Sequence, residues 1–307
     1  MKTMKLGQSN LQVPVIAVGC MRMKDLNKKD AEHLVQTALE DGANFFDHAD
    51  VYGRGASEEI FADAIHMNDT VREKIILQSK CGIRKVENTF DFSKEHILES
   101  VDGILKRLKT DYLDVLLLHR PDALVEPEEV AEAFDKLYSS GKVRNFGVSN
   151  HNPMQIQLLQ KSLNQPIVAN QLQLSITHAT MISSGIHVNM LDETAVNRDG
   201  SILDFCRLND ITIQPWSPFQ YGFFEGVFLD NEKFPELNAK INEIAAKYEV
   251  TNTTIALSWI LRHPAHMQPV TGTMNPERLK DCIKAADIYL TRQEWYDIYR
   301  AAGNILP

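Results

Sequence analysis

The sequence predicts an α/β fold of the (β/α)8 or TIM-barrel type, with an N-terminal β-hairpin and an extra C-terminal helix. Three observations support this. Short apolar segments alternate with longer amphipathic ones, the unit repeats eight times in 307 residues, and no Gly/Ser-rich linker divides the chain. Such alternation predicts parallel strands joined by right-handed crossovers, and eight units in about 300 residues fit a closed barrel better than an open sheet. We therefore expect one domain over residues 1–307.

The chain begins with the expected hairpin, whose strands at residues 4–6 and 11–13 flank a turn at residues 7–10. Eight strands follow, each a short and mostly apolar run typical of strands that are buried on both faces. They are predicted at residues 15–18, 44–47, 75–80, 113–119, 143–148, 168–172, 211–215 and 268–271.

Amphipathic segments separate the predicted strands, and several of them open with a capping residue or a proline at the first helical position. Helices are predicted at residues 28–41, 57–66, 94–108, 127–140, 153–163, 201–209, 253–262 and 276–286, with the extra helix at residues 292–300. The long irregular stretches are expected at residues 175–200 and 216–235. Loops of that length are more often functional than accidental, and both follow strand ends, where barrel enzymes carry their active sites.

Charge and composition exclude several classes of protein. There are 32 basic and 41 acidic residues, which gives a net charge of −9, and the two signs are interleaved along the chain. Because no basic stripe could neutralise a phosphate backbone, we expect no nucleic-acid partner. No apolar run is long enough to span a bilayer and the first residues lack the apolar core of a signal peptide, so we expect no membrane association and a cytoplasmic location. The four cysteines lie far apart, as expected of isolated thiols.

Polar residues end three consecutive predicted strands, where apolar residues would be expected. The second strand ends at Asp47, the third at Lys80 and the fourth at His119, and Tyr52 follows Asp47 by five residues. Each alone has an ordinary structural explanation, as a turn residue, a strand-end lysine, a core histidine or a surface tyrosine. Together they would converge on one patch, because neighbouring barrel strands end at the same rim.

Tyr, Lys, Asp and His together suit proton donation to a carbonyl oxygen that is acquiring charge. A phenol with a pKa of about 10 holds its proton too tightly to be an ideal acid at neutral pH. An ammonium group about 4 Å away contributes on the order of 4 kcal/mol, which is enough to lower that pKa substantially. Asp47 would keep Lys80 charged, and a neutral His119 would hydrogen-bond to the substrate oxygen, which leaves Tyr52 as the acid. None of these groups can supply a hydride, so a cofactor is required.

At this point the sequence resembles a known family. The segments FFDHADVYG, LQSKCGI, LLLHRPD, FGVSN, ANQLQLS, PWSPF and VTGTMNPERLKD are similar, in order and spacing, to the strand-end motifs of the aldo-keto reductases. The pattern is closest to that of the bacterial oxidoreductases of the YdhF type. The resemblance implies an NAD(P)H-dependent reduction of aldehydes or ketones, and it matches Asp47, Tyr52, Lys80 and His119 to the family's catalytic residues.

The resemblance also implies a nicotinamide dinucleotide site without a G-x-G-x-x-G loop. Residues matching Ser149, Asn150 and Gln171 bind the carboxamide in the family, and Trp216 takes the place of an aromatic residue, more often tyrosine, that stacks on the nicotinamide. Backbone amides after Ser217 and Pro218 would bind the pyrophosphate, and Met21 would edge the nicotinamide pocket.

The adenosine end of the cofactor is expected at Thr273 and Arg278, which would meet a 2′-phosphate. Gly272 stands where many NADPH-dependent members carry lysine, which is a departure from the family pattern. Arg278 favours NADPH over NADH, because a guanidinium pairs well with a phosphate.

Other functions have their own sequence arguments. A metal site at Asp47, His48 and Asp50 lacks the usual ligand spacing, and His151 after Ser149 does not form the G-x-S-x-G motif of a hydrolase. A Schiff-base lyase would use an uncharged Lys80, which the ion pair with Asp47 opposes. A cofactor-binding, redox-sensing regulatory subunit would use the same fold without turnover. The partner is expected to be a small carbonyl compound, and we expect a monomer or a weak homo-oligomer.

Overall fold

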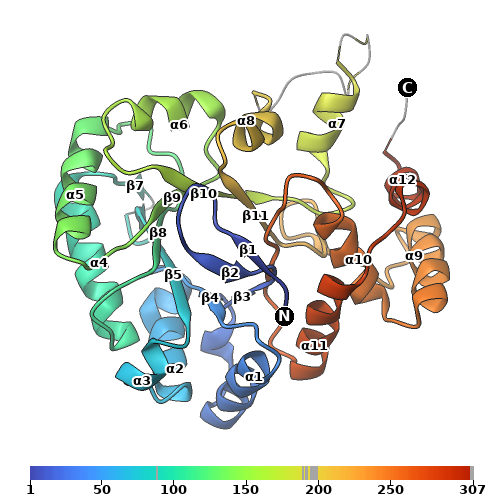
Figure 1. Cartoon of the computed structure of the whole chain (residues 1–307), viewed down its shortest axis with the longest axis horizontal. Helices are drawn as coiled ribbons and strands as arrows, with labels where there is room; N and C mark the ends of the chain where they lie inside the picture. Colours follow the sequence, from blue (N-terminus) through green and yellow to red (C-terminus); the bar gives the residue numbers. More distant parts are fainter. Residues whose placement is uncertain (88, 189, 191–192, 194–199, 305–307) are drawn as a thin grey trace.

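The computed structural model describes residues 1–87, 89–188, 190, 193 and 200–304. Its centre is a parallel sheet of eight strands in the order β11-β10-β9-β8-β5-β4-β3-β14. The backbone N–H of Gln268, just before β14, donates to the carbonyl oxygen of Ile213 in β11 at 3.0 Å, which joins the two edge strands. Figure 1 shows the barrel strands around the centre of the molecule and the helices outside them. The predicted (β/α)8 barrel is therefore confirmed.

Each predicted barrel strand overlaps an observed one. The strands are β3 (Ala17–Gly19), β4 (Phe45–Asp47), β5 (Ile76–Cys81), β8 (Val115–Leu118), β9 (Phe146–Ser149), β10 (Ile167–Gln173), β11 (Thr212–Trp216) and β14 (Val270–Thr271). Buried side chains on both faces explain why the sequence reads as continuous apolar runs.

The predicted helices are also present. They are α1 (Lys28–Glu40), α2 (Ala56–Ala64), α4 (Lys94–Leu108), α5 (Pro127–Ser139), α6 (Pro153–Gln160), α8 (Ile202–Leu208), α10 (Asn252–Leu261), α11 (Pro276–Lys284) and the extra helix α12 (Arg292–Ala301). Side chains cap many of their first turns, as the sequence indicated; Asn27, for example, accepts from the N–H of Asp30 at 3.0 Å.

Several elements were not predicted. Helix α9 (Pro235–Tyr248) precedes α10, so two helices connect the seventh and eighth strands, and the short α3 (Asp69–Arg72) precedes β5. The stretch at residues 175–200, expected to be irregular, contains α7 (Thr180–Ile186), and its residues 189, 191–192 and 194–199 lie outside the described ones. Two small hairpins, β6 (Ile83–Arg84) with β7 (Thr89–Phe90) and β12 (Gln220–Tyr221) with β13 (Gly226–Val227), lie in loops after β5 and β11.

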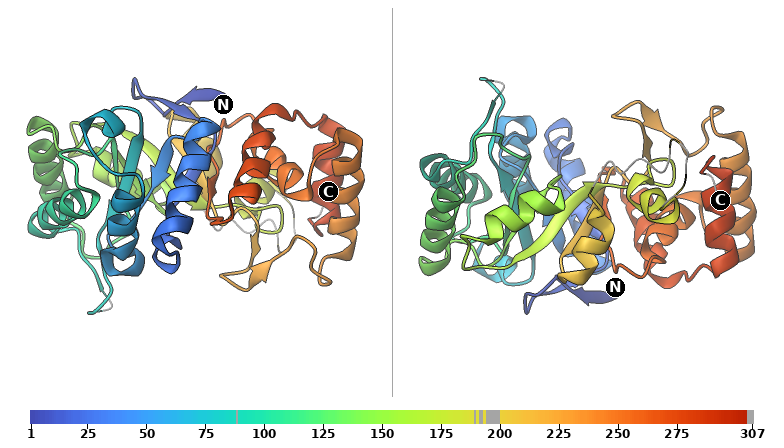
Figure 2. Two further views of the ribbon diagram at one scale, coloured as in Figure 1. Left: turned by 90° about the horizontal axis from the view of Figure 1, so that it is seen from below. Right: turned by 90° about the horizontal axis from the view of Figure 1, so that it is seen from above.

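The N-terminal hairpin, β1 (Thr3–Lys5) with β2 (Gln12–Pro14), covers one end of the barrel. The N–H of Gly7 donates to the Thr212 hydroxyl at 2.7 Å, and the Gln268 side chain donates to the carbonyl of Pro14 at 2.7 Å. Figure 2 shows this hairpin and the β12–β13 hairpin at opposite ends of the molecule. The hairpin thus closes the amino-terminal end and leaves the carboxyl ends of the strands for a site.

Strand alternation sorts the buried side chains of β5 into two sets. Ile76 belongs to an apolar cluster that the barrel strands form with Leu6 and Val13 of the hairpin, whereas Leu77 and Cys81 belong to the larger cluster shared with the helices. Gln78 and Lys80 have the same parity as Ile76, so they point into the barrel. The interior is therefore apolar near the hairpin and polar toward the other end.

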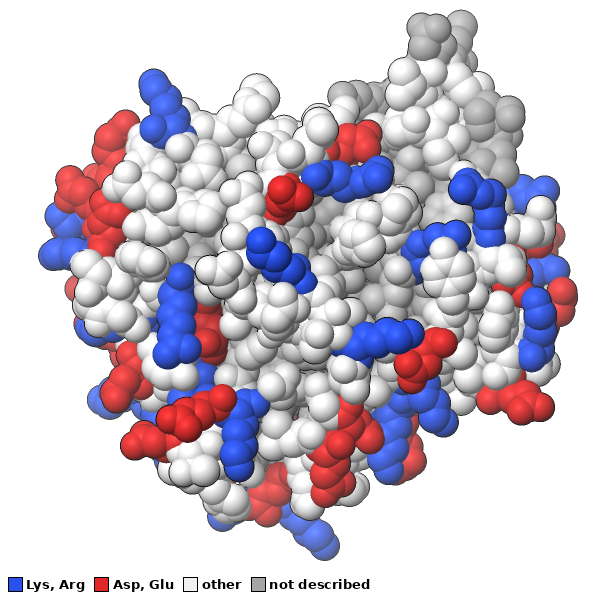
Figure 3. Space-filling view, viewed as in Figure 1, with Lys and Arg blue, Asp and Glu red and all other residues white. Residues whose placement is uncertain are grey.

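Three further features concern the helices, the surface charge and the extent of the domain. No helix of the described residues is long and apolar enough to cross a membrane. On the face seen in Figure 3, basic and acidic side chains alternate rather than forming blocks of one sign. We propose that the chain forms a single domain, because the barrel needs strands from Ala17 to Thr271 to close.

Candidate active site

The four residues predicted to act together lie at the carboxyl end of the barrel. Asp47 is the last residue of β4, Lys80 lies on β5, and His119 directly follows β8. Tyr52 begins the 3₁₀ turn Tyr52–Gly55, which leads from β4 into α2. Asp47, Tyr52 and His119 line one cleft, and Lys80 is fully buried behind them.

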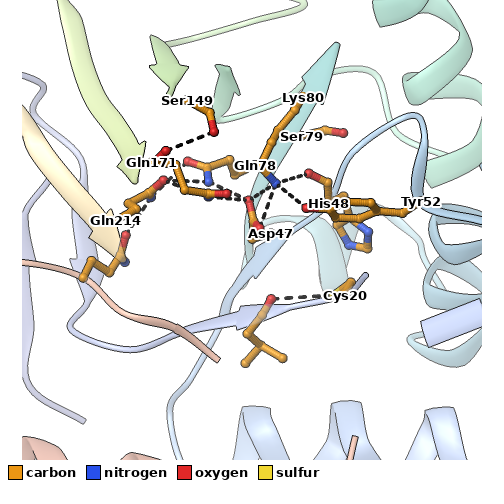
Figure 4. Close-up of polar contacts among 12 residues, drawn as sticks. Cys20, Asp47, His48, Tyr52, Gln78, Ser79, Lys80, Ser149, Gln171 and Gln214 are labelled. Atoms are coloured by element: carbon orange, nitrogen blue, oxygen red, sulfur yellow. Dashed lines mark hydrogen bonds and ion pairs between the residues drawn. The ribbon is translucent and has the colours of Figure 1, made fainter. Parts of the chain in front are cut away.

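The Lys80 ammonium lies between the carboxylate and the phenol (Figure 4). Its Nζ is 2.7 and 2.8 Å from the two carboxylate oxygens of Asp47 and 3.2 Å from the hydroxyl of Tyr52, and it also donates to the carbonyl of His48 at 2.7 Å. Burial opposes a charge on this group, but Asp47 and Tyr52 outweigh it and raise the pKa of Lys80. Lys80 is therefore a charged group held in a fixed direction.

The electrostatics of Tyr52 differ from the sequence-based expectation in one respect. Burial raises the pKa of the phenol and outweighs the Lys80 charge, which lowers it, while Asp47 adds to the increase. The expected net lowering of the pKa is therefore wrong for the protein by itself, because the cleft that brings Lys80 close also removes water from the phenol. Tyr52 consequently keeps its proton at neutral pH and can donate it.

His119 is neutral in this setting. Burial lowers its pKa well below the usual value, and the charges of Lys80 and Arg120 lower it further. Its ring meets the Tyr52 ring edge-on, with centroids 6.0 Å apart. A neutral imidazole beside a protonated phenol provides two hydrogen-bonding groups at the same end of the cleft.

A layer of side-chain amides inside the barrel, which was not predicted from the sequence, donates hydrogen bonds to Asp47. Gln78 donates to Asp47 at 2.7 Å and Gln171 does so at 3.2 Å. Gln214 exchanges hydrogen bonds with Gln78 at 2.9 and 3.0 Å and donates to Gln268 at 2.9 Å. A usable signal was the spacing of two between Gln78 and Lys80, which puts both on the inner face of β5.

The alternative site chemistries find no support in the geometry of the described residues. His48 packs edge-on against Phe61 at 4.6 Å, and burial lowers its pKa to about 3. No group of three or more metal-ligating side chains occurs in the described part of the chain. The Ser149 hydroxyl donates to the carbonyl of Gln171 at 3.0 Å, while Nδ1 of His151 contacts the Ser149 carbonyl at 2.9 Å, so the two side chains do not form a nucleophile and base.

The cleft has a volume of about 650 Å³, which is large enough for a substrate or for part of a bound dinucleotide. Every residue that the sequence assigned to a cofactor lies along it: Met21, Ser149, Asn150, Gln171, Trp216, Ser217, Pro218, Gly272, Thr273 and Arg278. The cleft is also lined by four residues that were not predicted to bind the cofactor: Arg120, Phe219, Phe224 and Asn252.

Hydrogen bonds fix the part of the cleft predicted to hold a carboxamide. Asn150 donates to the Ser149 hydroxyl at 2.8 Å and accepts from the indole N–H of Trp216 at 3.2 Å. Gln171 uses its amide N–H groups on Asp47 and Gln214, and among the described residues nothing donates to its Oε1. A free amide oxygen in the cleft is a suitable acceptor for a carboxamide NH₂, so these residues fit a nicotinamide.

The opposite part of the cleft offers groups for phosphates. Asn275 caps α11 by accepting from the N–H of Arg278 at 3.0 Å, and the Arg278 guanidinium forms no ion pair within the described residues. Arg22 reaches across from the β3 end and donates to the carbonyl of Gly272 at 3.4 Å. Two arginines and a helix N-terminus fit the phosphates of a dinucleotide.

Comparison with known proteins agrees with this geometry. The sequence model described as the Aldo/keto reductase family matches residues 15–302. The chain belongs to the aldo-keto reductase family. It is therefore an oxidoreductase of a family that uses nicotinamide cofactors and small-molecule substrates.

Two bacterial aldo-keto reductase relatives match nearly the whole chain. The uncharacterized oxidoreductase YcsN of Bacillus subtilis is 35% identical, over 97% of this chain and 97% of its own. The oxidoreductase YdhF of Escherichia coli is 31% identical, over 93% of this chain and 92% of its own. The resemblance to the YdhF type is thus confirmed.

Solved aldo-keto reductase structures share the fold. The thermostable enzyme Tm1743, in complex with the inhibitor epalrestat, has a TM-score of 0.79 and 26% identity, and the match covers 98% of this chain and 100% of that one. An aldo-keto reductase of Klebsiella pneumoniae, in complex with NADPH, has a TM-score of 0.78 and 23% identity, with 100% and 96% covered.

Proposed function

We propose that this aldo-keto reductase reduces aldehydes or ketones to alcohols with NADPH, and that Tyr52 is the general acid. The observation that carries the proposal is the contact of the buried Lys80 ammonium with both Asp47 at 2.7 Å and the Tyr52 hydroxyl at 3.2 Å, at the end of an open cleft. A charged amine in that place stabilises negative charge on the phenol oxygen as its proton leaves.

The remaining roles follow from position. Tyr52 would donate its proton to the carbonyl oxygen, and neutral His119 would hydrogen-bond to the same oxygen and orient it. Asp47, held by Gln78 and Gln171, would keep Lys80 charged. When bound, the dinucleotide supplies the hydride, which no side chain in the cleft can provide.

The cofactor would lie along the cleft in three parts. Its carboxamide would be held by Ser149, Asn150 and Gln171, and its nicotinamide ring would stack on Trp216 beside Met21. Its pyrophosphate would meet the backbone at Ser217 and Pro218. Thr273, Gly272 and Arg278 would surround the adenosine end. The Arg278 guanidinium, which has no ion pair within the described residues, favours NADPH, since it matches a 2′-phosphate that NADH lacks. In an equilibrium titration, NADPH should bind more tightly than NADH.

The rival functions are less well supported. A Schiff-base lyase needs an uncharged lysine, and the raised pKa of Lys80 opposes this. A redox-sensing regulatory subunit would bind the cofactor but would not depend on the Tyr52 hydroxyl. The sequence-based expectations of a monomer or weak homo-oligomer and of a cytoplasmic location stay predictions.

The test is the substitution Tyr52→Phe, with 4-nitrobenzaldehyde as substrate and loss of NADPH absorbance as the readout. Removal of a general acid should lower kcat by about 10²- to 10⁴-fold, while the affinity for NADPH stays within about twofold. Tyr138→Phe, an exposed tyrosine on α5, is the matched control. A Tyr52→Phe enzyme as active as the control would disprove the role of Tyr52, and NADPH binding without any turnover of the wild type would favour the regulatory function.

A further inference from the structure

Arg120 is a half-buried cation in the cleft that the roles above do not use. It directly follows His119, lines the cleft, and has its guanidinium carbon 5.8 Å from the centroid of the Trp216 ring. Within the described part of the chain it forms no hydrogen bond or ion pair. Burial lowers the pKa of Arg120, and the guanidinium shares the cleft with His119 and Tyr52.

Other arginines shielded from water in this protein have partners. Arg72 donates to Asp114 at 2.7 Å and to the carbonyls of Ile75 and Tyr112 at 3.0 Å, and Arg107 donates to Glu58 at 2.6 Å. Partial burial of a charge without a partner costs free energy that such contacts offset. Among the described residues nothing gives Arg120 this compensation, and a bound anion would supply it.

Among the described residues, the carboxylates that line the cleft are not available to Arg120. The carboxylates that line the cleft are engaged: Asp47 by Lys80 at 2.7 Å, Asp230 by Asn252 at 2.9 Å, and Asp281 by Lys284 at 4.0 Å. The described part of the cleft therefore leaves the place beside Arg120 open to an anion from solvent.

The cofactor's phosphates do not fit this place either. Arg120 follows β8, whereas Thr273 and Arg278 follow β14, and these strands are four apart in the closed order of eight. Their ends consequently face each other across the mouth of the barrel. Phosphates that meet Arg278 would therefore lie across the mouth of the barrel from Arg120.

We propose that Arg120 binds an anionic group of the substrate, so that the enzyme acts on aldehydes or ketones that carry a carboxylate or a similar anion a few bonds from the carbonyl. The inference rests on the proposed reductase function and specifies its substrate class. Guanidinium groups bind carboxylates through two parallel hydrogen bonds, which fix orientation as well as charge. The aromatic side chains of Phe219 and Phe224 in the same cleft would contact the apolar body of such a substrate.

The test compares four substrates. 4-Carboxybenzaldehyde carries the carboxylate, and 4-formylbenzenesulfonate presents a different anion. The methyl ester of 4-carboxybenzaldehyde and 4-nitrobenzaldehyde are both uncharged. The wild type should have at least a tenfold higher kcat/KM for the carboxylate than for the ester. In Arg120→Met this ratio should fall at least tenfold, mainly through KM, and Arg120→Lys should restore part of it. Equal losses for charged and neutral substrates in Arg120→Met would show that Arg120 only packs against Trp216, and would overturn the inference. The sulfonate distinguishes recognition of any anion from recognition of a carboxylate.

A binding measurement keeps the two proposals apart. Benzoate, added to the enzyme with NADP⁺ and followed by tryptophan fluorescence, should bind the wild type and should bind Arg120→Met at least tenfold more weakly. If the enzyme reduces neutral aldehydes but benzoate binds the wild type and Arg120→Met equally well, the reductase function stands and the role of Arg120 is disproved. Benzoate binding that depends on Arg120, without reduction of any aldehyde, would disprove the reductase function and retain the anion site.

Discussion

A fully buried lysine is unusual, and Lys80 is charged because every contact around it is complementary. Asp47 contributes two carboxylate contacts and the His48 carbonyl a third, at 2.7 to 2.8 Å. The convergence of Asp47, Tyr52, Lys80 and His119 could be predicted from strand-end positions. That Arg120 has no hydrogen-bond or ion-pair partner among the described residues could not be predicted, because a sequence does not reveal which charges lack a partner.

We predict that Asp47→Asn destabilises the protein by about 3 to 5 kcal/mol, because it leaves the Lys80 charge buried without its counter-ion. Asp63→Asn is the matched control, since its ion pair with Lys109 at 2.5 Å is exposed. Exposed pairs contribute less than about 1 kcal/mol. Urea unfolding of both variants measures the difference, and similar losses in the two would contradict the prediction.

Helix α12 shows how an element is attached to its neighbours. Thr291 and Glu294 form a capping box at its first turn, and Glu294 also accepts from Lys247 at 2.6 Å and Tyr248 at 3.0 Å, both on α9. The sequence predicted α12 but not α9. The expectation of one helix per strand assigned the last crossover to residues 253–262, and only the packing of α9 against α12 shows that two helices are needed there.

The same contacts predict a pH dependence. Burial alone would raise the pKa of Glu294, but Lys247 and Thr291 lower it to about 2. Because the folded pKa lies below the unfolded one, this stabilisation is present above pH 4.5 and is lost as the pH falls toward 2.

Glu294→Gln should therefore lower the free energy of unfolding by about 1 to 2 kcal/mol at pH 7. The difference in the free energy of unfolding between this variant and the wild type should shrink as the pH falls below 4.5. Gln155→Ala removes the uncharged partner of the capping box on α6 and should give a difference that does not depend on pH. Denaturant unfolding from pH 3 to 7 measures the free energy of unfolding of both variants. A Glu294→Gln effect that stays constant over this pH range would disprove the lowered pKa of Glu294.

At the scale of the molecule, the interior of the barrel is apolar near the N-terminal hairpin and has a layer of polar side chains toward the carboxyl ends of the strands. The layer joins strands far apart in the chain: Gln78 and Gln214 are separated by 136 positions, and Gln214 also donates to Gln268 beside β14. It links the strands at which the barrel closes to the strand that carries Lys80. Closure and the position of the proposed ion pair are therefore coupled.

We predict that Gln214→Leu destabilises the barrel by about 2 to 5 kcal/mol, since it removes the N–H groups that donate to the buried amide oxygens of Gln78 and Gln268. Gln157→Leu, on the exposed side of α6, is the control and should be nearly neutral. Thermal unfolding should show one transition for the wild type and a lower midpoint for Gln214→Leu. Two separate transitions would argue against a single domain, and an unchanged midpoint would argue against a structural role for the amide layer.

The sequence by itself determined the eightfold repeat, the N-terminal hairpin and the residues at the mouth of the barrel, because apolar periodicity and strand-end positions are local properties of the chain. Only folding set the net direction of the Tyr52 pKa, the amide layer that holds Asp47, and the lack of a partner for Arg120 within the described part of the chain. Each of these depends on burial and on partners that are distant in the chain, and solvent exclusion arises only when the strands have closed around them.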